Sequence, residues 1–418
     1  MGARAVTDAM VATPMTAIAA ADTLLVVNAG SSSIKFALYG VSSSPAGLRP
    51  IWTGHVARVA DADTWQIEDA DGQLLEQSQQ PTAGVNFDHE AALTRVFDWL
   101  DALPDARAPV AIGHRVVHGG MGYSSPVRVT DAVLRELTAL VPWAPLHQPH
   151  NLAPVRAAAL RWPGVMQVAC FDTAFHRTQP AVAQAFALPR AITDAGVQRY
   201  GFHGLSFESV ASQLPAVLGD RSSAATGHGK VIVAHLGHGA SLCAIHGGKS
   251  VASTMGFSVL DGLVMGTRCG TLDAGVVLHL LQRGMTAQQV SDLLYEQSGL
   301  LGVSGLSGDM AVLLASSDPR AVQAIDLFVY RAVCDIGAMT AALGGLDALV
   351  FTAGIGEHAA PVRARVVAGC AWLGAVLDDG ANSIDLELIH APTSKVQLAV
   401  VATDEESVIA AHTLAHLR

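Results

Sequence analysis

The sequence has few cysteines, few charged residues and few aromatic residues. Its five cysteines are scattered through 418 residues, without a CxxC pair or another metal-ligand spacing. An odd number of dispersed cysteines is typical of reduced thiols in a cytoplasmic protein, and it argues against a disulfide framework or a zinc site. Only 15% of the residues are charged and 50% are hydrophobic, so the chain can bury a large core and is not disordered.

Basic stretches and long apolar runs are also missing. The formal net charge is -11 and no basic stripe offsets it, which argues against nucleic acid and anionic membranes as partners. No stretch approaches the roughly 20 uninterrupted apolar residues of a membrane-spanning helix. Asp8 and Pro14 interrupt the apolar start of the chain, so residues 1–21 are interpreted as a flexible extension and not as a signal peptide.

The sequence does contain a recurring pattern of buried strand, small polar turn and following apolar residues. The pattern occurs at residues 24–39 (LLVVN-AGSSS-IKFALY) and 230–246 (KVIVAHLGHGASLCAIH), and it begins again at Ala348 (ALVFTAGIGEH). Strands that end in glycine-marked turns, with helices between them, predict an α/β fold. Because the pattern recurs far along a chain long enough for two domains, we expect two related halves.

Several helices have clear start and stop signals. Residues 318–344 begin with Asp-Pro and end with glycine, which predicts one long helix. Thr286–Gln289 forms a capping-box pattern, whose helix is expected to run to about Gly299, and Thr403–Glu406 forms another that is expected to open the C-terminal helix. Residues 41–108 are the least regular, and we expect an irregular insertion of short strands and loops there.

The glycine and serine turns are candidate phosphate sites. Small residues leave backbone N–H groups accessible to a ligand and serine hydroxyls add donors, which together favour a polyanion such as a nucleotide phosphate tail. One such turn is weak evidence, whereas three that each follow an apolar strand directly are hard to explain as structural accidents. Two facing turns, one from each half, are expected to hold a phosphate chain. Lys35 adds a nearby cation, with an exposed strand lysine as the structural alternative.

Seven motifs, in order, resemble the acetate kinase family. They are NAGSSSIKF (28–36), GHRVVHGG (113–120), FDTAFH (171–176), RYGFHG (199–204), MGFSVLDGLVMGTRCG (255–270), FTAGIGE (351–357) and TDEE (403–406). The resemblance covers nearly the whole chain from about Asp22 onward. It implies an actin-like ATPase fold, in which two duplicated, ribonuclease H-like α/β domains enclose ATP and an acyl substrate in an interdomain cleft. The implied domains are 22–174 plus 404–418, and a nucleotide-binding domain at 175–403.

The resemblance assigns the central chemistry to four residues. A carboxylate that attacks the γ-phosphate of ATP brings two anions together, so the site must neutralise their repulsion and align them. By similarity, Arg115 binds the substrate carboxylate, and Arg268 stabilises the transferring phosphoryl group with its planar guanidinium. His203 is expected to donate a hydrogen bond to the phosphoryl oxygens, and Asp172 to orient the substrate or the arginines. A purely structural interpretation would make Arg115 an ion-pair residue and His203 an ordinary core histidine.

The rest of the expected site also follows from the resemblance. The acyl-pocket positions are Val117, Leu146, Phe202 and Val259, with His147 as an accessory residue. The nucleotide-binding positions are Ser31, Ser33, Lys35, His235, Leu236, Gly237, His238, Gly239, Asp309, Met310, Ala311, Gly354, Ile355, Gly356, Glu357 and His358. Mg²⁺, with Mn²⁺ as an alternative, is expected at Asn28 and Glu405, because the capping box would assign Glu406 to the helix terminus.

Five positions depart from the family pattern. His238, Ala311 and His358 stand where the family usually has Asn, Arg and Asn, and all three are expected on the nucleotide side. The donor is therefore expected to be ATP in a loosened pose, another nucleoside triphosphate or an inorganic polyphosphate. Gln148 replaces a usual asparagine, and Val259 replaces a usual proline of the acyl pocket.

The expected function is that of an acetate kinase, which transfers phosphoryl reversibly between ATP and acetate to give acetyl phosphate and ADP. An apolar pocket selects an acyl group by size, and one methylene changes binding by roughly 1–3 kcal/mol, so propionate or butyrate as the acceptor stays open. Two further functions also stay open: a nucleotide-binding regulator of the same fold with a decayed ATP site, and a sugar kinase of the same superfamily. The resemblance implies a cytoplasmic homodimer.

Overall fold

The computed structural model describes residues 22–30, 33–41, 48–59, 62–81, 88–103, 108–219 and 229–418. Contacts between Cα atoms divide the chain into two compact units. Unit 1 contains the described residues up to Gly119, together with Ser125–Phe171 and Glu405–Arg418, and unit 2 contains Gly120–Ser124 and Asp172–Asp404. The domain limits expected from the sequence stay a prediction, and the expected N-terminal extension lies outside the described residues.

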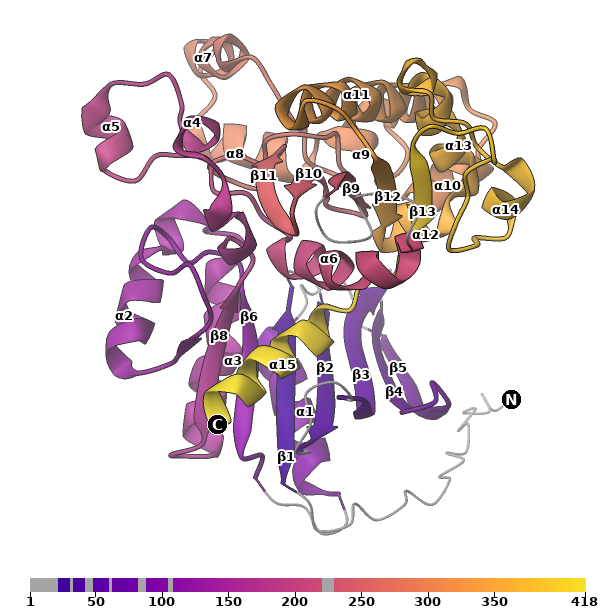
Figure 1. Cartoon of the computed structure of the whole chain (residues 1–418). Helices are drawn as coiled ribbons and strands as arrows, with labels where there is room; N and C mark the ends of the chain where they lie inside the picture. The colour runs from indigo at the N-terminus through magenta and orange to yellow at the C-terminus, as the bar shows by residue number, and fades with distance from the viewer. Residues whose placement is uncertain are drawn as a thin grey trace, which may run out of the picture. The chain divides into compact units, whose positions relative to one another are not determined.

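Unit 1 is built on an eight-stranded mixed sheet (Figure 1). Its strands are β1 (Thr23–Ala29), β2 (Ser33–Gly40), β3 (Pro50–Val59), β4 (Ala62–Asp69), β5 (Leu74–Pro81), β6 (Ala111–Val116), β7 (Val127–Arg128) and β8 (Met166–Phe171). Their spatial order is β5-β4-β3-β2-β1-β6-β8-β7. Neighbours from β5 to β1 are antiparallel, whereas β1, β6 and β8 are mutually parallel.

The helices of unit 1 pack on this sheet. They are α1 (His89–Asp101), α2 (Asp131–Ala139), the 3-10 segment η2 (Val141–Trp143), α3 (Gln148–Arg161) and α15 (Glu405–Leu417). The expected irregular insertion at 41–108 is wrong for its described part, because β3, β4 and β5 form a regular antiparallel meander. An aromatic cluster with rings from β2, β3, β4 and α1 orders the region, with ring centroids 5.6 to 6.2 Å apart: Phe36, Trp52, Trp65 and Trp99.

Unit 2 is built on a five-stranded mixed sheet with a related topology. Its strands are β9 (Lys230–Leu236), β10 (Ala240–His246), β11 (Lys249–Ser253), β12 (Ala348–Thr352) and β13 (Gln397–Val400), in the order β11-β10-β9-β12-β13. The pairs β11–β10 and β10–β9 are antiparallel, and β9, β12 and β13 are parallel. The order β3-β2-β1-β6-β8 in unit 1 has the same directions. The α/β class and the expected duplication are therefore confirmed.

The helices of unit 2 contain many more residues than its strands. They are η3 (Ala174–Thr178), α4 (Ala181–Gln184), α5 (Arg190–Asp194), α6 (Gly204–Leu218), α7 (Ala274–Gln282), α8 (Ala287–Glu296), α9 (Gly299–Ser304), α10 (Met310–Ala315), α11 (Pro319–Leu343), α12 (Ala353–His358), α13 (Ala360–Gly369), η5 (Ala371–Leu373) and α14 (Asp379–Ser383). The long helix is confirmed as α11, with Asp318 as its N-cap and Gly344 at φ 67° as its C-cap. The Thr286 capping box is confirmed at α8, which ends at Glu296.

The capping box expected at Thr403–Glu406 is wrong. The backbone N–H of Thr403 donates to Oε1 of Glu357 at 3.4 Å, and Oγ1 of Thr403 has no hydrogen-bond partner among the described residues. The Glu406 carboxylate instead accepts from the side chain of Asn28. A tertiary hydrogen bond has replaced the local one that the sequence pattern predicts.

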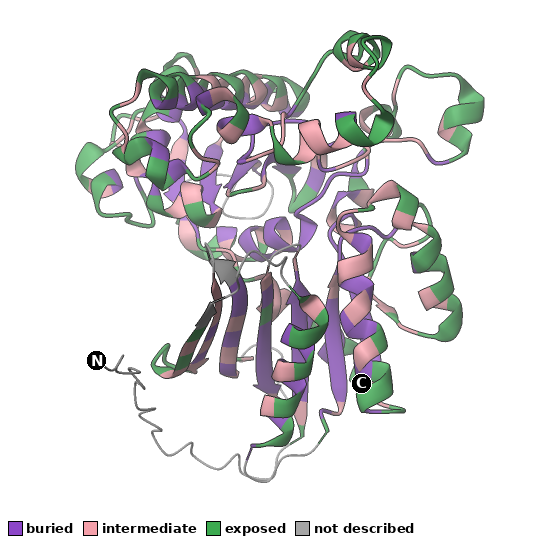
Figure 2. Cartoon of the chain, turned by 180° about the vertical axis from the view of Figure 1, so that it is seen from behind, coloured by how far each residue is buried: buried purple, intermediate pink, exposed green. Residues whose placement is uncertain are grey.

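The core of each unit lies on its central strands (Figure 2). Residues of β1 and β6 in unit 1, and of β9 and β12 in unit 2, are almost entirely buried. Of these strands, β1, β9 and β12 are mostly apolar because helices cover both of their faces. In the part of the chain that the structure describes, no helix is both long and apolar enough to cross a membrane.

Candidate active site

The ends of two parallel strands and the start of α15 converge in unit 1. Asn28 lies near the end of β1, Arg115 near the end of β6, and Glu405 and Glu406 open α15. Nδ2 of Asn28 donates to Oε2 of Glu405 at 3.1 Å and to Oε1 of Glu406 at 2.8 Å. Nη1 of Arg115 donates to Oδ1 of Asn28 at 3.3 Å, and its Nε lies 3.9 Å from Oε2 of Glu405. The structure therefore brings three predicted residues of this unit together.

The Asn28 cluster combines one cation with two adjacent carboxylates. Burial raises the pKa of Glu406, and the charge of Glu405 raises it further. Lys35, on β2 and exposed, has the opposite effect on the pKa of Glu406 through its positive charge. Two carboxylates and an amide suit a hard cation such as Mg²⁺, which takes oxygen ligands and keeps several waters. Among the described residues no group of three His, Cys, Asp or Glu could hold a metal, so any metal here has few protein ligands.

The acyl positions of unit 1 adjoin the same strand ends. Val117 directly follows β6, is 3% exposed, and donates its backbone N–H to Oδ1 of Asn151 at 2.8 Å. Leu146 is half-buried, and His147 is the residue before α3. Gln148 is fully buried and its amide bonds backbone groups of His118 and Leu137, so this departure from the family pattern has a structural role. Of the phosphate-turn serines, Ser33 begins β2, and Ser31 lies outside the described residues.

In unit 2, His203 stands at the start of α6 with a left-handed backbone at φ 57°. A non-glycine residue in this region is uncommon and frequently marks a functional site. Its Nδ1 shares a hydrogen bond of 2.8 Å with Oγ of Ser241, and its ring stacks on His235 with centroids 4.1 Å apart. His235 shares a bond of 2.8 Å with Ser206 through its own Nδ1. These contacts fix the His203 ring and direct its Nε2 toward the turn between β9 and β10.

That turn packs closely against the two expected phosphoryl-binding side chains. A Cβ built on Gly239 would lie 2.6 Å from Nη2 of Arg268 and 3.2 Å from Nε2 of His203. Only glycine permits this approach, which explains the second glycine of the HLGHG motif in terms of space. Nη1 of Arg268 donates to the carbonyl of Val259 at 2.8 Å, so a hydrogen bond within the motif at residues 255–270 orients the guanidinium. Gly239, His203 and Arg268 are thus brought together.

His238, a departure from the family pattern, lies beside the same arginine. Burial lowers the pKa of His238, and the charge of Arg268 lowers it further, while Asp309 acts in the opposite direction. Its backbone carbonyl accepts from the N–H of Gly266 at 2.9 Å, and a Cβ on Gly266 would collide with the imidazole. The ring is therefore packed on the motif at residues 255–270 and favours its neutral form.

Some of the remaining nucleotide positions make hydrogen bonds that stabilise the local backbone. Asp309 caps α10 by accepting from the N–H of Val312 at 3.0 Å, Met310 is buried and Ala311 is exposed. Oε1 of Glu357 accepts from the N–H of Ala353 at 2.7 Å, where the backbone has φ 65°. The segment from Gly354 to His358 forms most of α12.

Sequence reasoning missed Arg363, which holds α12 in place. Its side chain is 0% exposed and donates to the carbonyls of Gly356 at 3.0 Å and Glu357 at 2.8 Å. The same guanidinium donates to Asn382 through Nε and Nη2, each at 2.8 Å, and to Asp385 at 2.5 Å. The only signal was an arginine among apolar residues, between Val362 and Ala364.

Asp172 begins unit 2 directly after β8 and is 1% exposed. Its backbone carbonyl accepts from the N–H of Gly204 at 3.0 Å, and a Cβ on Gly204 would collide with that oxygen. The residue before Gly204 is His203, so the backbone of Asp172 lies close in space to that of His203. Phe202 and Val259, the acyl positions of this unit, are 1% and 8% exposed.

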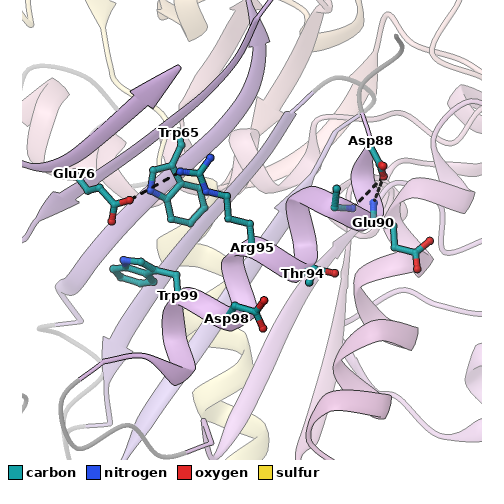
Figure 3. A pocket seen from close by; sticks show the side chains of 9 residues that line it. Trp65, Glu76, Asp88, Glu90, Thr94, Arg95, Asp98 and Trp99 are labelled. Carbon is teal, nitrogen blue, oxygen red and sulfur yellow. Dashed lines mark hydrogen bonds and ion pairs between the residues drawn. The ribbon is translucent and has the colours of Figure 1, made fainter. Parts of the chain in front are cut away.

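A surface hollow of about 750 Å³ lies elsewhere on unit 1 (Figure 3). It is bordered by α1, β4 and β5, and none of the predicted site residues is among those that line it. The Arg95 guanidinium lies 4.4 Å above the Trp65 ring, donates to Ser78 at 2.7 Å and lies 3.9 Å from Glu76. These contacts close the edge of the aromatic cluster and explain why Arg95 and Glu76 lie there.

The duplicated fold, with glycine-marked turns after the first strand of each half, defines an actin-like α/β protein. The comparisons name the family within this class. The Acetokinase family model matches residues 23–411. The chain is 50% identical over 394 residues to an acetate kinase of Rhodopseudomonas palustris (strain TIE-1), covering 94% of this chain and 97% of the relative. It is 49% identical over 401 residues to an acetate kinase of Methylocella silvestris, covering 94% and 98%. The chain therefore belongs to the acetokinase family.

Solved structures agree with this assignment. A propionate kinase from Francisella tularensis subsp. tularensis SCHU S4 matches with a TM-score of 0.83 and 34% identity, covering 94% of this chain and 99% of its own. The Porphyromonas gingivalis acetate kinase matches with a TM-score of 0.80 and 34% identity, covering 95% and 100%. The actin-like fold implied by the sequence motifs is thus confirmed.

Proposed function

We propose that the chain is an acetate kinase that exchanges a phosphoryl group between ATP and acetate, giving acetyl phosphate and ADP. The observation that carries this proposal is the 50% identity to acetate kinases over 94% of the chain. The intact clusters around Asn28 in unit 1 and around Gly239 in unit 2 support it. The acceptor carboxylate has no proton to lose, so the reaction needs positioning and charge neutralisation and does not need a general base.

Five of the predicted residues receive a role in this proposal. A carboxylate oxygen of acetate, held by Arg115, attacks the γ-phosphorus while the bond to the β,γ-bridging oxygen breaks and ADP leaves. Arg268 and His203, which both approach Gly239, neutralise the charge on the transferring phosphoryl oxygens. Mg²⁺, with Mn²⁺ as an alternative, would be held through Glu405 and Asn28 and would screen the phosphate charges.

The test is formation of acetyl hydroxamate from acetate, Mg·ATP and hydroxylamine by the purified chain. We expect turnover that Arg115→Ala and Arg268→Ala each reduce by at least about a hundredfold in kcat, the scale of losing one transition-state donor. A screen of ATP, GTP and pyrophosphate identifies the donor, which His238, Ala311 and His358 leave open. Absence of acyl phosphate with every donor would favour the regulator, and phosphorylation of a polyol alone would favour the sugar kinase.

A second candidate acceptor is propionate, with butyrate as the larger homologue. The observation that favours it is the structural match to a propionate kinase at 34% identity. An apolar pocket discriminates one methylene by only about 10- to 200-fold, so the preferred acceptor must be measured. Comparing kcat/KM for acetate, propionate and butyrate identifies it. A larger kcat/KM for propionate than for acetate would overturn our assignment of the acceptor.

We also propose that the chain forms a homodimer in the cytoplasm. Helix α7 supports the dimer, since none of its nine described residues is buried and its apolar side chains Val276, Leu278 and Leu281 are 40%, 58% and 39% exposed. Exposed apolar surface of this kind marks contact sites. Light scattering that gives a monomer mass, unchanged by Leu278→Asp, would contradict the dimer. The five cysteines are free thiols, which accords with a reducing compartment.

A further inference from the structure

Asn151 links two backbone segments that carry predicted active-site residues. It lies in the first turn of α3 and is 1% exposed. Its Nδ2 donates to the carbonyl of Ala29 at 2.7 Å, and its Oδ1 accepts from the N–H of Val117 at 2.8 Å. The nitrogen of this buried amide is therefore bonded at the end of β1, and its oxygen is bonded just after the end of β6.

These two bonds connect β1 and β6 beyond the last backbone pair of those two strands. The parallel register between β1 and β6 ends at Val27 and His114. Ala29 and Val117 lie beyond that pair, where the parallel register no longer joins the two strands. A side-chain amide presents an N–H donor and a C=O acceptor in one plane, as a peptide group does. Asn151 thus takes the place of a ladder peptide between the ends of β1 and β6.

The linked segments place Asn28 and Arg115. Ala29 follows Asn28 directly and Val117 is two residues beyond Arg115. Nη1 of Arg115 reaches Oδ1 of Asn28 at only 3.3 Å, so a small shift between the strand ends would break that contact. The alignment of an acceptor carboxylate with a phosphoryl donor is sensitive to shifts of this size.

Neighbours of Asn151 on the same turn support the arrangement. His150 stacks on His89 with ring centroids 4.1 Å apart, and Nε2 of His89 lies 2.8 Å from the carbonyl of Gly30. Gln148 bonds the backbone N–H and carbonyl of His118 at 3.3 and 3.1 Å. The start of α3 therefore contacts His118, which follows Val117, directly, and it contacts Gly30, which follows Ala29, through His89.

We propose that Asn151 is a positioning residue that fixes the spacing between Asn28 and Arg115 for phosphoryl transfer. This inference rests on the proposed function. In this proposal, the buried amide of Asn151 holds Asn28, on the metal and phosphate side of unit 1, at a fixed distance from Arg115, on the carboxylate-binding side. Loss of one of its two bonds should affect one substrate more than the other, which a merely structural residue would not do.

The experiment uses two variants of the full chain. Asn151→Asp keeps an oxygen that accepts from Val117 but places a carboxylate against the carbonyl of Ala29. We expect its KM for Mg·ATP to rise about tenfold while its KM for acetate stays within about twofold of wild type. Asn151→Leu removes both bonds, and we expect both KM values to rise and kcat to fall about tenfold or more. Thr340→Val, which removes a buried hydroxyl bonded only within α11, is the control for lost stability.

Amide hydrogen exchange of the peptide that contains Val117 gives a readout without substrate. We expect faster exchange than wild type in Asn151→Leu and near wild-type exchange in Asn151→Asp. Equal kinetic losses in both variants, or kinetics within about twofold of wild type in both, would overturn the proposal. If the wild-type chain forms no acyl phosphate, the proposed function fails instead, and unchanged Val117 exchange in Asn151→Leu would still refute the role of Asn151.

Discussion

The side-chain amide of Asn28 donates to the carboxylate of Glu406 at 2.8 Å, although 378 positions separate the two residues. The same nitrogen donates to Glu405 at 3.1 Å. Asn28 therefore touches both glutamates of the TDEE motif, and the motif is tied to the end of β1 and not to its own helix terminus. Glu406 fixes the amide that Arg115 also contacts, which makes it a partner of the cluster without making it a metal ligand.

Glu405→Ala should weaken the response to Mg²⁺ more than Glu406→Ala does. Glu405 is the carboxylate that Arg115 also approaches, and the proposal gives it the metal, whereas Glu406 makes the shorter of the two bonds to Asn28, 2.8 Å against 3.1 Å. We expect the half-saturating Mg²⁺ concentration to rise about tenfold for Glu405→Ala, the scale of losing a charge-assisted contact. Titration of activity with Mg²⁺ measures this half-saturating concentration. Equal shifts in the two variants, after correction for stability, would contradict the different roles given to Glu405 and Glu406.

Thr403→Val should leave stability unchanged or raise it. A functional capping box would lose about 1 kcal/mol when its hydroxyl is removed. Here Oγ1 of Thr403 is buried and has no hydrogen-bond partner in the described part of the chain, so an isosteric methyl group removes a desolvated polar atom. Urea unfolding of the variant and of wild type measures the difference. A loss near 1 kcal/mol would restore the capping interpretation.

Gly239→Ala should reduce turnover while the protein stays folded. The added methyl group would lie 2.6 Å from Nη2 of Arg268, and the flexible arginine can swing away at little cost to stability. Because Arg268 is then displaced from the phosphoryl group, we expect kcat to fall about a hundredfold with a melting temperature close to wild type. Gly122→Ala is the control, because its new methyl group meets nothing within 4 Å. Wild-type kcat in Gly239→Ala would argue against this position for Arg268.

Ala311→Arg should lower the KM for ATP. The position is exposed on α10, so an arginine fits there without entering the core, and its guanidinium can stack on an aromatic base. We expect a fall of about threefold to tenfold, equivalent to about 1 kcal/mol. Ala311→Lys is the matched charge control, because it adds the charge without the planar group. An unchanged KM for ATP in Ala311→Arg would mean that the base binds elsewhere.

Stability should fall as the pH is lowered from about 6.5 toward 4. Burial lowers the pKa of His114, His118 and His176 to about 4 in the folded protein. The unfolded chain therefore takes up these protons first, so stability is complete above the unfolded pKa and is lost as the pH falls toward the folded one. His118→Phe should reduce the slope by about 1.4 kcal/mol per pH unit, measured by urea unfolding at several pH values. His246→Phe, at an exposed site, should not change it.

The elements that the sequence predicted correctly are those with local signals. The helix from Pro319 to Leu343 carries its own start and stop residues, and the box at Thr286 is closed by Gln289 only three positions away. The β3–β5 meander was missed because its outer face is polar and its order depends on rings from α1 and β2. Glu406 was misassigned because its partner is remote in the sequence.

The sequence by itself determined the α/β class, the duplicated halves, the acetokinase family and most of the candidate site residues. Short-range periodicity and glycine placement are properties of neighbouring residues, so they can be read without coordinates. Only the tertiary structure decided that Glu406 bonds Asn28, that Arg363 holds α12, and that Asn151 joins β1 to β6. Each of these is a hydrogen bond between segments whose approach depends on how the sheet and helices pack, and no local pattern records that packing.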